Sequence, residues 1–212
     1  MIENSTGLIL RTRPLTETSL IVHWLTRDLG RLATVAKGAR RPKSPFAGKL
    51  DLFYLADLSV QRSRRSELHT LREVSLRDPH AALRKNLGYV EQASYAAALI
   101  EQTTEMDTPL PEIFSLMAGF LKHLPEKPPR PQTLFAFEVK LLSELGLQPD
   151  FEKDRLGPDI KQLLRIFLVS DWPALARVKL SGSQITQLRQ FLHGFLVYHL
   201  GKVPATRSRR MP

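Results

Sequence analysis

The first part of the chain carries short stretches in which apolar and polar residues follow the two-residue period of a strand. Residues 19–26 show the pattern most clearly, with Leu20, Val22 and Trp24 on one face. A tight turn is expected after them, because Gly30 supplies the positive φ that such a turn needs. Similar stretches cover residues 5–13, 31–37, 52–62 and 67–76. Five short strands in this part of the chain fit a five-stranded Greek-key barrel of the OB type.

From Asp78 on, the apolar residues recur at the spacing of helices. Asp78 is expected to cap a helix that starts at Pro79. Further helices are expected from Thr108-Pro109, over 134–145, from Pro158, and from Ser181, which forms a capping-box pattern with Gln184. The sequence therefore predicts an α+β protein. Its OB-type barrel domain would cover residues 1–77, and a helical bundle domain with a basic C-terminal tail would cover residues 78–212.

The net charge of the chain indicates which class of macromolecule it binds. The chain has 31 Lys and Arg against 21 Asp and Glu, which gives a net charge of +10. Such an excess favours a polyanion, either nucleic acid or an anionic membrane surface. Many of the cations lie in loops rather than along one helical face, so nucleic acid is preferred and no membrane is expected. No signal peptide or spanning segment is recognisable, and a cytoplasmic, nucleoid-associated protein is expected.

A run of cations follows the third predicted strand, where Gly38 and Pro42 forbid regular structure. Phe46, between Pro45 and Ala47, is the best candidate for stacking on a base, whereas Trp24 is expected in the core. A solvated charged loop is the alternative. The predicted nucleic-acid contacts are Arg31, Lys37, Arg40, Arg41, Lys43, Phe46, Lys49, Arg62, Arg64 and Arg65.

Enzymatic chemistry finds little support in the sequence. The chain has no cysteine, which excludes disulfides, thiolate nucleophiles and Cys-ligated zinc. It has no GxxxxGK[ST] or GxGxxG loop and no HExxH spacing. Asp51 and Asp57 are the only carboxylates considered for a magnesium-dependent nuclease, and structural roles are favoured for both. We therefore predict a protein that is not an enzyme and needs no metal or cofactor.

One segment, ETSLIVHWLTRDLGRLATVAKGARRPKS (17–44), resembles the signature of the RecO recombination mediators of bacterial recombinational repair. The resemblance continues in later pieces, among them Phe137-Glu138 and the stretch from His199 to Lys202. It covers essentially the whole chain and implies an N-terminal OB barrel with a helical C-terminal domain. It also implies binding of single- and double-stranded DNA and annealing of complementary strands, in support of the exchange of single-stranded-DNA-binding protein for recombinase. The implied protein partners are RecR and the acidic C-terminal tail of single-stranded-DNA-binding protein.

Two departures from the family limit what carries over. Many members hold zinc with four cysteines, but residues 148–157 contain none, so zinc is not expected. The arginine that some relatives place before the Phe-Glu pair is also missing, so the tail-binding groove is sought among Arg130, Phe135, Phe137 and Lys140. A basic OB-fold adaptor that binds RNA remains the alternative function.

Overall fold

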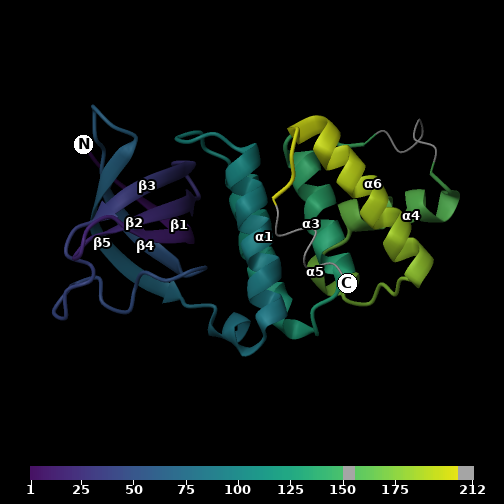
Figure 1. The fold of residues 1–212 in the computed structure, drawn as a ribbon, viewed down its shortest axis with the longest axis horizontal. Coiled ribbons are helices and arrows are strands. Elements are labelled where there is room, and N and C mark those ends of the chain that lie inside the picture. The colour runs from purple at the N-terminus through teal and green to yellow at the C-terminus, as the bar shows by residue number, and fades with distance from the viewer. Residues whose placement is uncertain (150–155, 205–212) are drawn as a thin grey trace. The chain divides into compact units, whose positions relative to one another are not determined.

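The computed structural model describes residues 1–149 and 156–204 (Figure 1). The chain divides into two compact units, each built from two segments. The first unit contains Met1–Ala82 and Thr104–Ala118, and the second contains Leu83–Thr103 and the chain from Gly119 on. The basic tail expected at the C-terminus lies outside the described residues from residue 205 on.

The first unit is built on a closed barrel in which the strands follow the order β1-β2-β3-β5-β4. All neighbouring strands are antiparallel except β3 and β5, which are parallel. The five strands are β1 (Ile2–Pro14), β2 (Leu20–Thr26), β3 (Arg31–Ala36), β4 (Leu55–Gln61) and β5 (Leu68–Asp78). The expected five-stranded OB-type barrel followed by helices is confirmed.

Trp24 fills the barrel interior, as the alternation over residues 19–26 predicts. Its side chain is fully buried, and its indole Nε1 donates a hydrogen bond of 2.9 Å to Thr34 Oγ1. Thr34 comes from the neighbouring strand and is itself buried, so the only polar atom of the indole has a partner inside the core.

The chain after the barrel is helical, but it does not begin as predicted. Strand β5 runs on to Asp78, whose Oδ1 accepts a hydrogen bond from the backbone nitrogen of His80. Pro79 therefore does not open a helix, and the prediction that it does is wrong. The helical elements are η1 (Ala81–Lys85), α1 (Leu87–Thr103), α2 (Pro111–His123), η2 (Leu124–Glu126), α3 (Pro131–Glu144), α4 (Pro158–Val169), α5 (Trp172–Leu175) and α6 (Gly182–Leu200).

Helix α3 lies at the centre of the second unit, where it contacts α1, α4, α5 and α6. Phe135 and Phe137 are fully buried in this core. The Tyr95 hydroxyl donates a 2.6 Å hydrogen bond to the buried carboxylate of Glu138. Helix α6 begins with the predicted capping box, formed by Ser181 with Gln184.

Candidate nucleic-acid interface

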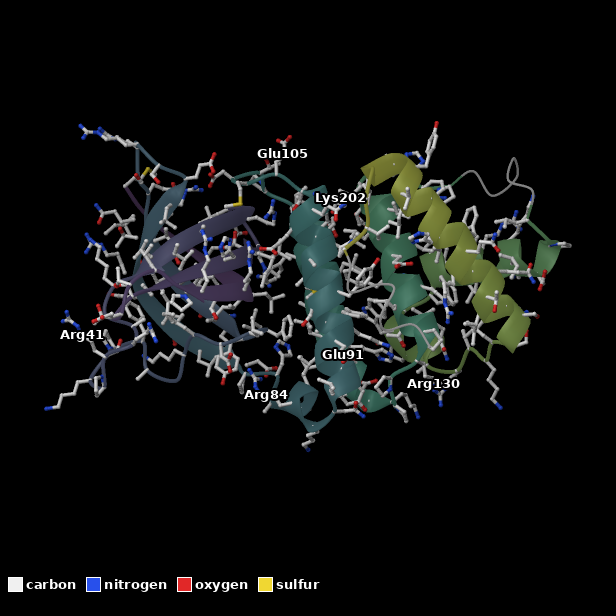
Figure 2. All side chains as sticks on the ribbon, viewed as in Figure 1. Arg41, Arg84, Glu91, Glu105, Arg130 and Lys202 are labelled. Carbon is white, nitrogen blue, oxygen red and sulfur yellow. The ribbon has the colours of Figure 1, made fainter. Side chains whose placement is uncertain are left out.

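The basic loop, which we define as residues 37–49, follows β3 and is anchored on the connection between β1 and β2. The backbone nitrogen of Arg40 donates to Thr18 O at 3.0 Å, and its Nη1 donates to Thr16 O at 3.2 Å. Gly38 adopts a φ of +69°, which lets the chain turn directly after the strand. The exposed cations of this loop are Lys37, Arg40, Arg41 and Lys43. Arg41 points away from the barrel into solvent (Figure 2).

The second half of the basic loop turns inward and closes the barrel. Phe46 is only 7% exposed and lies in the barrel core together with Trp24. The expectation that Phe46 stacks on a base is therefore wrong, because an apolar ring next to an open barrel end gains more by covering the core. Lys49 is half-buried.

The connection between β4 and β5 carries three of the predicted cations in two different environments. Arg62 lies between two carboxylates: its Nε donates to Glu3 Oε2 at 2.8 Å, and its Nη1 contacts Asp107 Oδ1. This arginine joins the start of the barrel to the segment after α1, so a phosphate would have to compete with two ion pairs. Arg64 and Arg65 are exposed.

Arg31 lies with two further cations, Arg11 and Arg13, on the outer face of β1, β2 and β3. These two arginines were not among the residues predicted from the sequence. Arg11 lies opposite His23, and His23 lies opposite Ala33 in the next strand. The Arg31 Nε donates to Thr104 Oγ1 at 2.7 Å, which holds the guanidinium over this face. Together these strands and the β4–β5 connection form a pocket of about 480 Å³, which we call the arginine pocket; its lining is Arg11, Arg13, His23, Arg31, Ala33, Ser66, Glu67, Leu68 and Met106.

The positive charge of the arginine pocket affects the pKa of His23. Burial, together with the charges of Arg11, Arg13 and Arg31, lowers the pKa of His23 to about 4. The imidazole is therefore neutral at neutral pH, and the three arginines that add to the effect of burial also attract anions.

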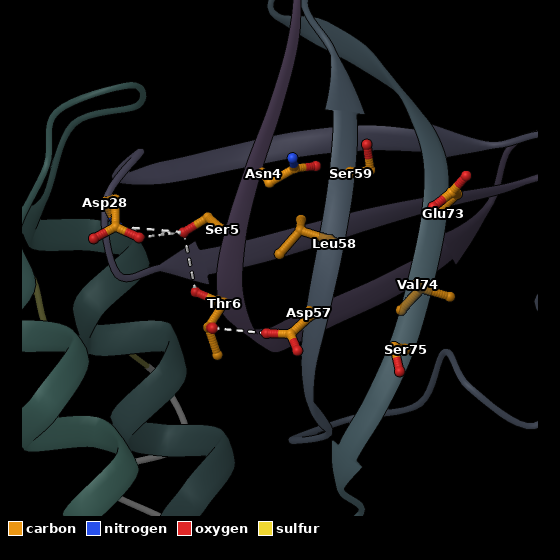
Figure 3. Close-up of a pocket in the computed structure, with 10 residues that line it drawn as sticks. All are labelled: Asn4, Ser5, Thr6, Asp28, Asp57, Leu58, Ser59, Glu73, Val74 and Ser75. Carbon is orange, nitrogen blue, oxygen red and sulfur yellow. Dashed lines mark hydrogen bonds between the residues drawn. The ribbon is translucent and has the colours of Figure 1, made fainter.

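A second pocket of about 370 Å³ lies on another part of the barrel surface, over β1, β4 and β5 (Figure 3). Its lining includes three carboxylates, those of Asp28, Asp57 and Glu73. Asp57 Oδ1 accepts a 2.8 Å hydrogen bond from Thr6 Oγ1, and Asp57 Oδ2 pairs with Arg77 at 2.6 Å. Repulsion between these carboxylates and phosphate makes this side of the barrel unsuited to nucleic acid.

The groove sought in the helical unit is not formed by the residues predicted for it. Phe135 and Phe137 are fully buried and offer no surface to a partner, so that part of the prediction is wrong. Both rings lie on the central helix, where packing on all sides covers them. The Lys140 Nζ donates to Leu168 O at 2.7 Å, and burial lowers the pKa of this lysine despite the nearby Glu144 and Asp171. Arg130 precedes α3 and is half-buried.

Neither a metal cluster nor a membrane helix is found in residues 1–149 and 156–204. No three His, Asp or Glu side chains there come together as metal ligands. Asp51 accepts a hydrogen bond from the next backbone nitrogen, while Asp57 pairs with Arg77. Residues 150–155, in the segment compared with the family's zinc site, lie outside this part of the chain. None of its helices is long and apolar enough to cross a bilayer.

A β-bulge explains why the arginine pocket escaped the sequence pattern. Simple alternation puts Arg11 on the same face as Ile9, which is fully buried. The register between β1 and β2 shifts between these two residues, and the extra residue turns Arg11 outward. Arg13 then follows on the same outer face. The charge of Arg11 was the available signal, because an arginine is rarely buried in the core of a barrel this small.

Comparison with known proteins agrees with this architecture. The family model for the N-terminal part of recombination protein O matches residues 1–80, and the model for its C-terminal part matches residues 86–157. The chain is 36% identical over 144 residues to a protein named DNA repair protein RecO from Anaeromyxobacter sp. (strain K). That match covers 68% of this chain and spans 57% of the relative's length.

Two Bacillus proteins with the same name match over more of their length. Identity is 28% to the protein of Bacillus pumilus and 27% to that of Bacillus subtilis, each over 91% of this chain and 87% of the relative. The two family models together match well over half of the chain and fall on the barrel and on the helices that follow it. The chain therefore belongs to the RecO family.

Proposed function

We propose that this chain acts in DNA repair as a recombination mediator that binds DNA through the cations of its barrel. The observation that supports this most directly is that the arginine pocket lies on β1, β2 and β3, and that Arg13 extends it toward the end of β3 from which the basic loop leaves. Arg13 lies opposite Ile21, which lies opposite Val35, and Lys37 follows two residues later. Arg40 is hydrogen-bonded to the β1–β2 connection beside them. The cations of the pocket and of the basic loop thus belong to the same three strands and the loop that follows them, and in this proposal they form one strip.

Such a strip suits a phosphate backbone. Exposed cations that lie close together repel one another, and a polyanion relieves this repulsion while both sides release counterions. Arg41 and Lys43 are both exposed, so their side chains are accessible to phosphates. We propose the same strip for single and double strands, since phosphates are common to both.

Annealing follows from the same chemistry. Two complementary strands repel one another through their phosphates, and a protein that shields both backbones lets their bases meet. In this proposal the protein provides charge and position and performs no covalent chemistry. The expected product is therefore a duplex in which both strands keep their original length.

The test is an annealing assay with two labelled complementary strands, with and without Mg²⁺. We expect the full-length protein to speed duplex formation, and strand length to stay the same when Mg²⁺ is present. Shortened strands would contradict the non-enzymatic account. Parallel titrations with RNA of the same sequence address the alternative function, because a clear preference for RNA would replace the mediator by an RNA-binding adaptor.

The proposed protein partners are RecR and the acidic, apolar tail of single-stranded-DNA-binding protein. A mediator meets single strands that are already covered, so contact with the covering protein would bring it to them. Arg130 and Lys140 remain the cations considered for such a tail, without the two buried phenylalanines. The test uses the full chain and a tail peptide: the peptide should inhibit annealing of covered strands and spare naked ones. Equal inhibition of both would remove tail docking and leave DNA binding in place.

A further inference from the structure

The arginine pocket differs from the basic loop because it combines cations with an apolar floor. Ala33 is 8% exposed, and Leu68 lies opposite it across the parallel β3–β5 pair. Met106 reaches the same place, since it bridges to Arg31 and belongs to the segment after α1. These three apolar side chains line the same pocket as the guanidinium groups, and we call them the floor of the pocket.

The dimensions and the lining indicate the kind of ligand. A volume of about 480 Å³ falls within the range of about 300–1,000 Å³ typical of small-ligand sites. Three arginines can hold a phosphate by charge-assisted hydrogen bonds. An apolar floor favours the flat face of a base, whereas a free phosphate or a sugar alone would leave it uncovered.

We propose that the arginine pocket takes one unpaired nucleotide of a bound strand, with its phosphate among Arg11, Arg13 and Arg31 and its base on the floor of Ala33, Leu68 and Met106. This inference rests on the proposed DNA binding and deepens it. A base inside a duplex would have to break its stacking and its pairing before it could enter the pocket, whereas an unpaired base does not have to break base pairs. The pocket therefore distinguishes single strands from duplexes, while the basic loop serves both.

The acidic side chain of the lining fits this arrangement. Glu67 lies on the β4–β5 connection, whereas Arg11 and Arg13 belong to β1. Its carboxylate repels phosphate from that side, so the phosphate lies toward β1. The charged side chains of the lining besides His23 are thus three arginines and this one carboxylate.

The main test compares two double variants that remove the same charge. In R11Q/R13Q the pocket loses two cations, and in R40Q/R41Q the basic loop loses two. With oligothymidylate and a duplex as probes, we expect R11Q/R13Q to lose about tenfold in affinity for the single strand and less than about threefold for the duplex. R40Q/R41Q should weaken both probes by similar factors.

A neutral variant separates the shape of the pocket from its charge. A33L fills the floor without changing any charge, and should weaken single-strand binding while duplex binding stays the same. Its melting temperature, measured alongside, shows whether the barrel stays folded. If A33L fails to fold, M106A, which removes part of the floor from a loop, is expected to give the same selective loss.

A last readout follows the occupied pocket directly. The pKa of His23, measured by NMR, should rise when a four-nucleotide oligothymidylate binds, because a phosphate offsets the arginine charges. Equal losses for both probes in R11Q/R13Q, or an unchanged His23 pKa at saturation, would overturn the nucleotide pocket and leave the DNA interface standing. Failure of the unmodified protein to bind any strand would overturn both.

Discussion

Gly30 lies directly against the backbone of Thr108, so closely that no larger residue fits between β2 and β3 at this turn. A Cβ built on Gly30 would lie 2.6 Å from the Thr108 nitrogen and closer still to its carbonyl, and Gly30 has a φ of +71°. Its carbonyl also accepts hydrogen bonds from the nitrogen and the hydroxyl of Thr26. The turn that presents Arg31 to the arginine pocket is thus fixed by the segment after α1.

Gly30→Ala should therefore destabilise the protein strongly. The left-handed backbone costs an alanine ~1–2 kcal/mol, and the clash adds ~1–3 kcal/mol, since backbone must move. Gly48→Ala is the matched control: Gly48 has the same φ of +71°, but nothing lies within 4 Å of its Cβ position. Urea denaturation should show a clearly larger loss for Gly30→Ala. Equal losses would show that Thr108 does not restrict this turn.

The stability of the protein should fall as the pH is lowered below that of neutral solution. The pKa of His23 is about 4 in the folded protein, against an ordinary value of 6.5. Below pH 6.5 His23 becomes protonated in the unfolded chain, whereas in the folded chain it is protonated only near pH 4. Between these pH values the unfolded state binds more protons, so the free energy of unfolding decreases. The contribution of neutral His23 is complete above pH 6.5 and is lost progressively as the pH approaches 4.

A His23→Gln variant isolates this effect, because glutamine does not titrate. The free energy of unfolding, measured with urea at pH 7.5 and pH 5, should fall less in the variant than in the unmodified protein. The imidazole is partly exposed, so solvent screening reduces the size of the difference and its direction is the informative result. The same pH dependence in both proteins would show that burial and the arginines do not lower the pKa of His23 in the folded protein.

Arg62 is expected to serve stability rather than DNA binding. Arg62→Ala removes hydrogen bonds to two carboxylates and should lower the free energy of unfolding by about 1–2 kcal/mol. The salt dependence of DNA binding should stay the same. The double variant R64A/R65A should show the opposite behaviour, with unchanged stability and a flatter salt dependence. A flatter salt dependence in Arg62→Ala would place this arginine at the interface.

Metal removal should leave folding intact. The chain has no cysteine to supply thiolate ligands, and structural zinc sites mostly need them. We expect EDTA to leave the melting temperature unchanged in a thermal scan. A large drop would indicate a site made of His and carboxylate ligands.

The barrel could be predicted from the sequence because its signals are local. Alternation around Trp24 and the turn at Gly30 place the β2–β3 hairpin without reference to the rest of the chain. The face of Arg11 could not be predicted in this way, because it depends on a bulge in the pairing of β1 with β2. The prediction that Phe46 stacks on a base was wrong for a related reason. Whether an aromatic side chain in a loop covers the core depends on the path of the loop in three dimensions.

The helical unit shows the same division between local and distant causes. The capping box at Ser181 is contained in four residues and was predicted correctly. Pro79 gave a misleading signal, because pairing with β4 extends β5 to Asp78 and delays the first helix. The burial of Phe135 and Phe137 follows from the central place of α3, which several other helices determine together.

The most direct test of the account is the salt dependence of DNA binding in the variant K37A/R40A/R41A/K43A. Each cation that neutralises a phosphate contributes ~0.7–0.9 to the slope of log affinity against log salt concentration. If all four contact phosphates, the slope should be flatter than that of the unmodified protein by about 3–4. An unchanged slope, with the variant still folded, would contradict the claim that the basic loop of the barrel binds DNA.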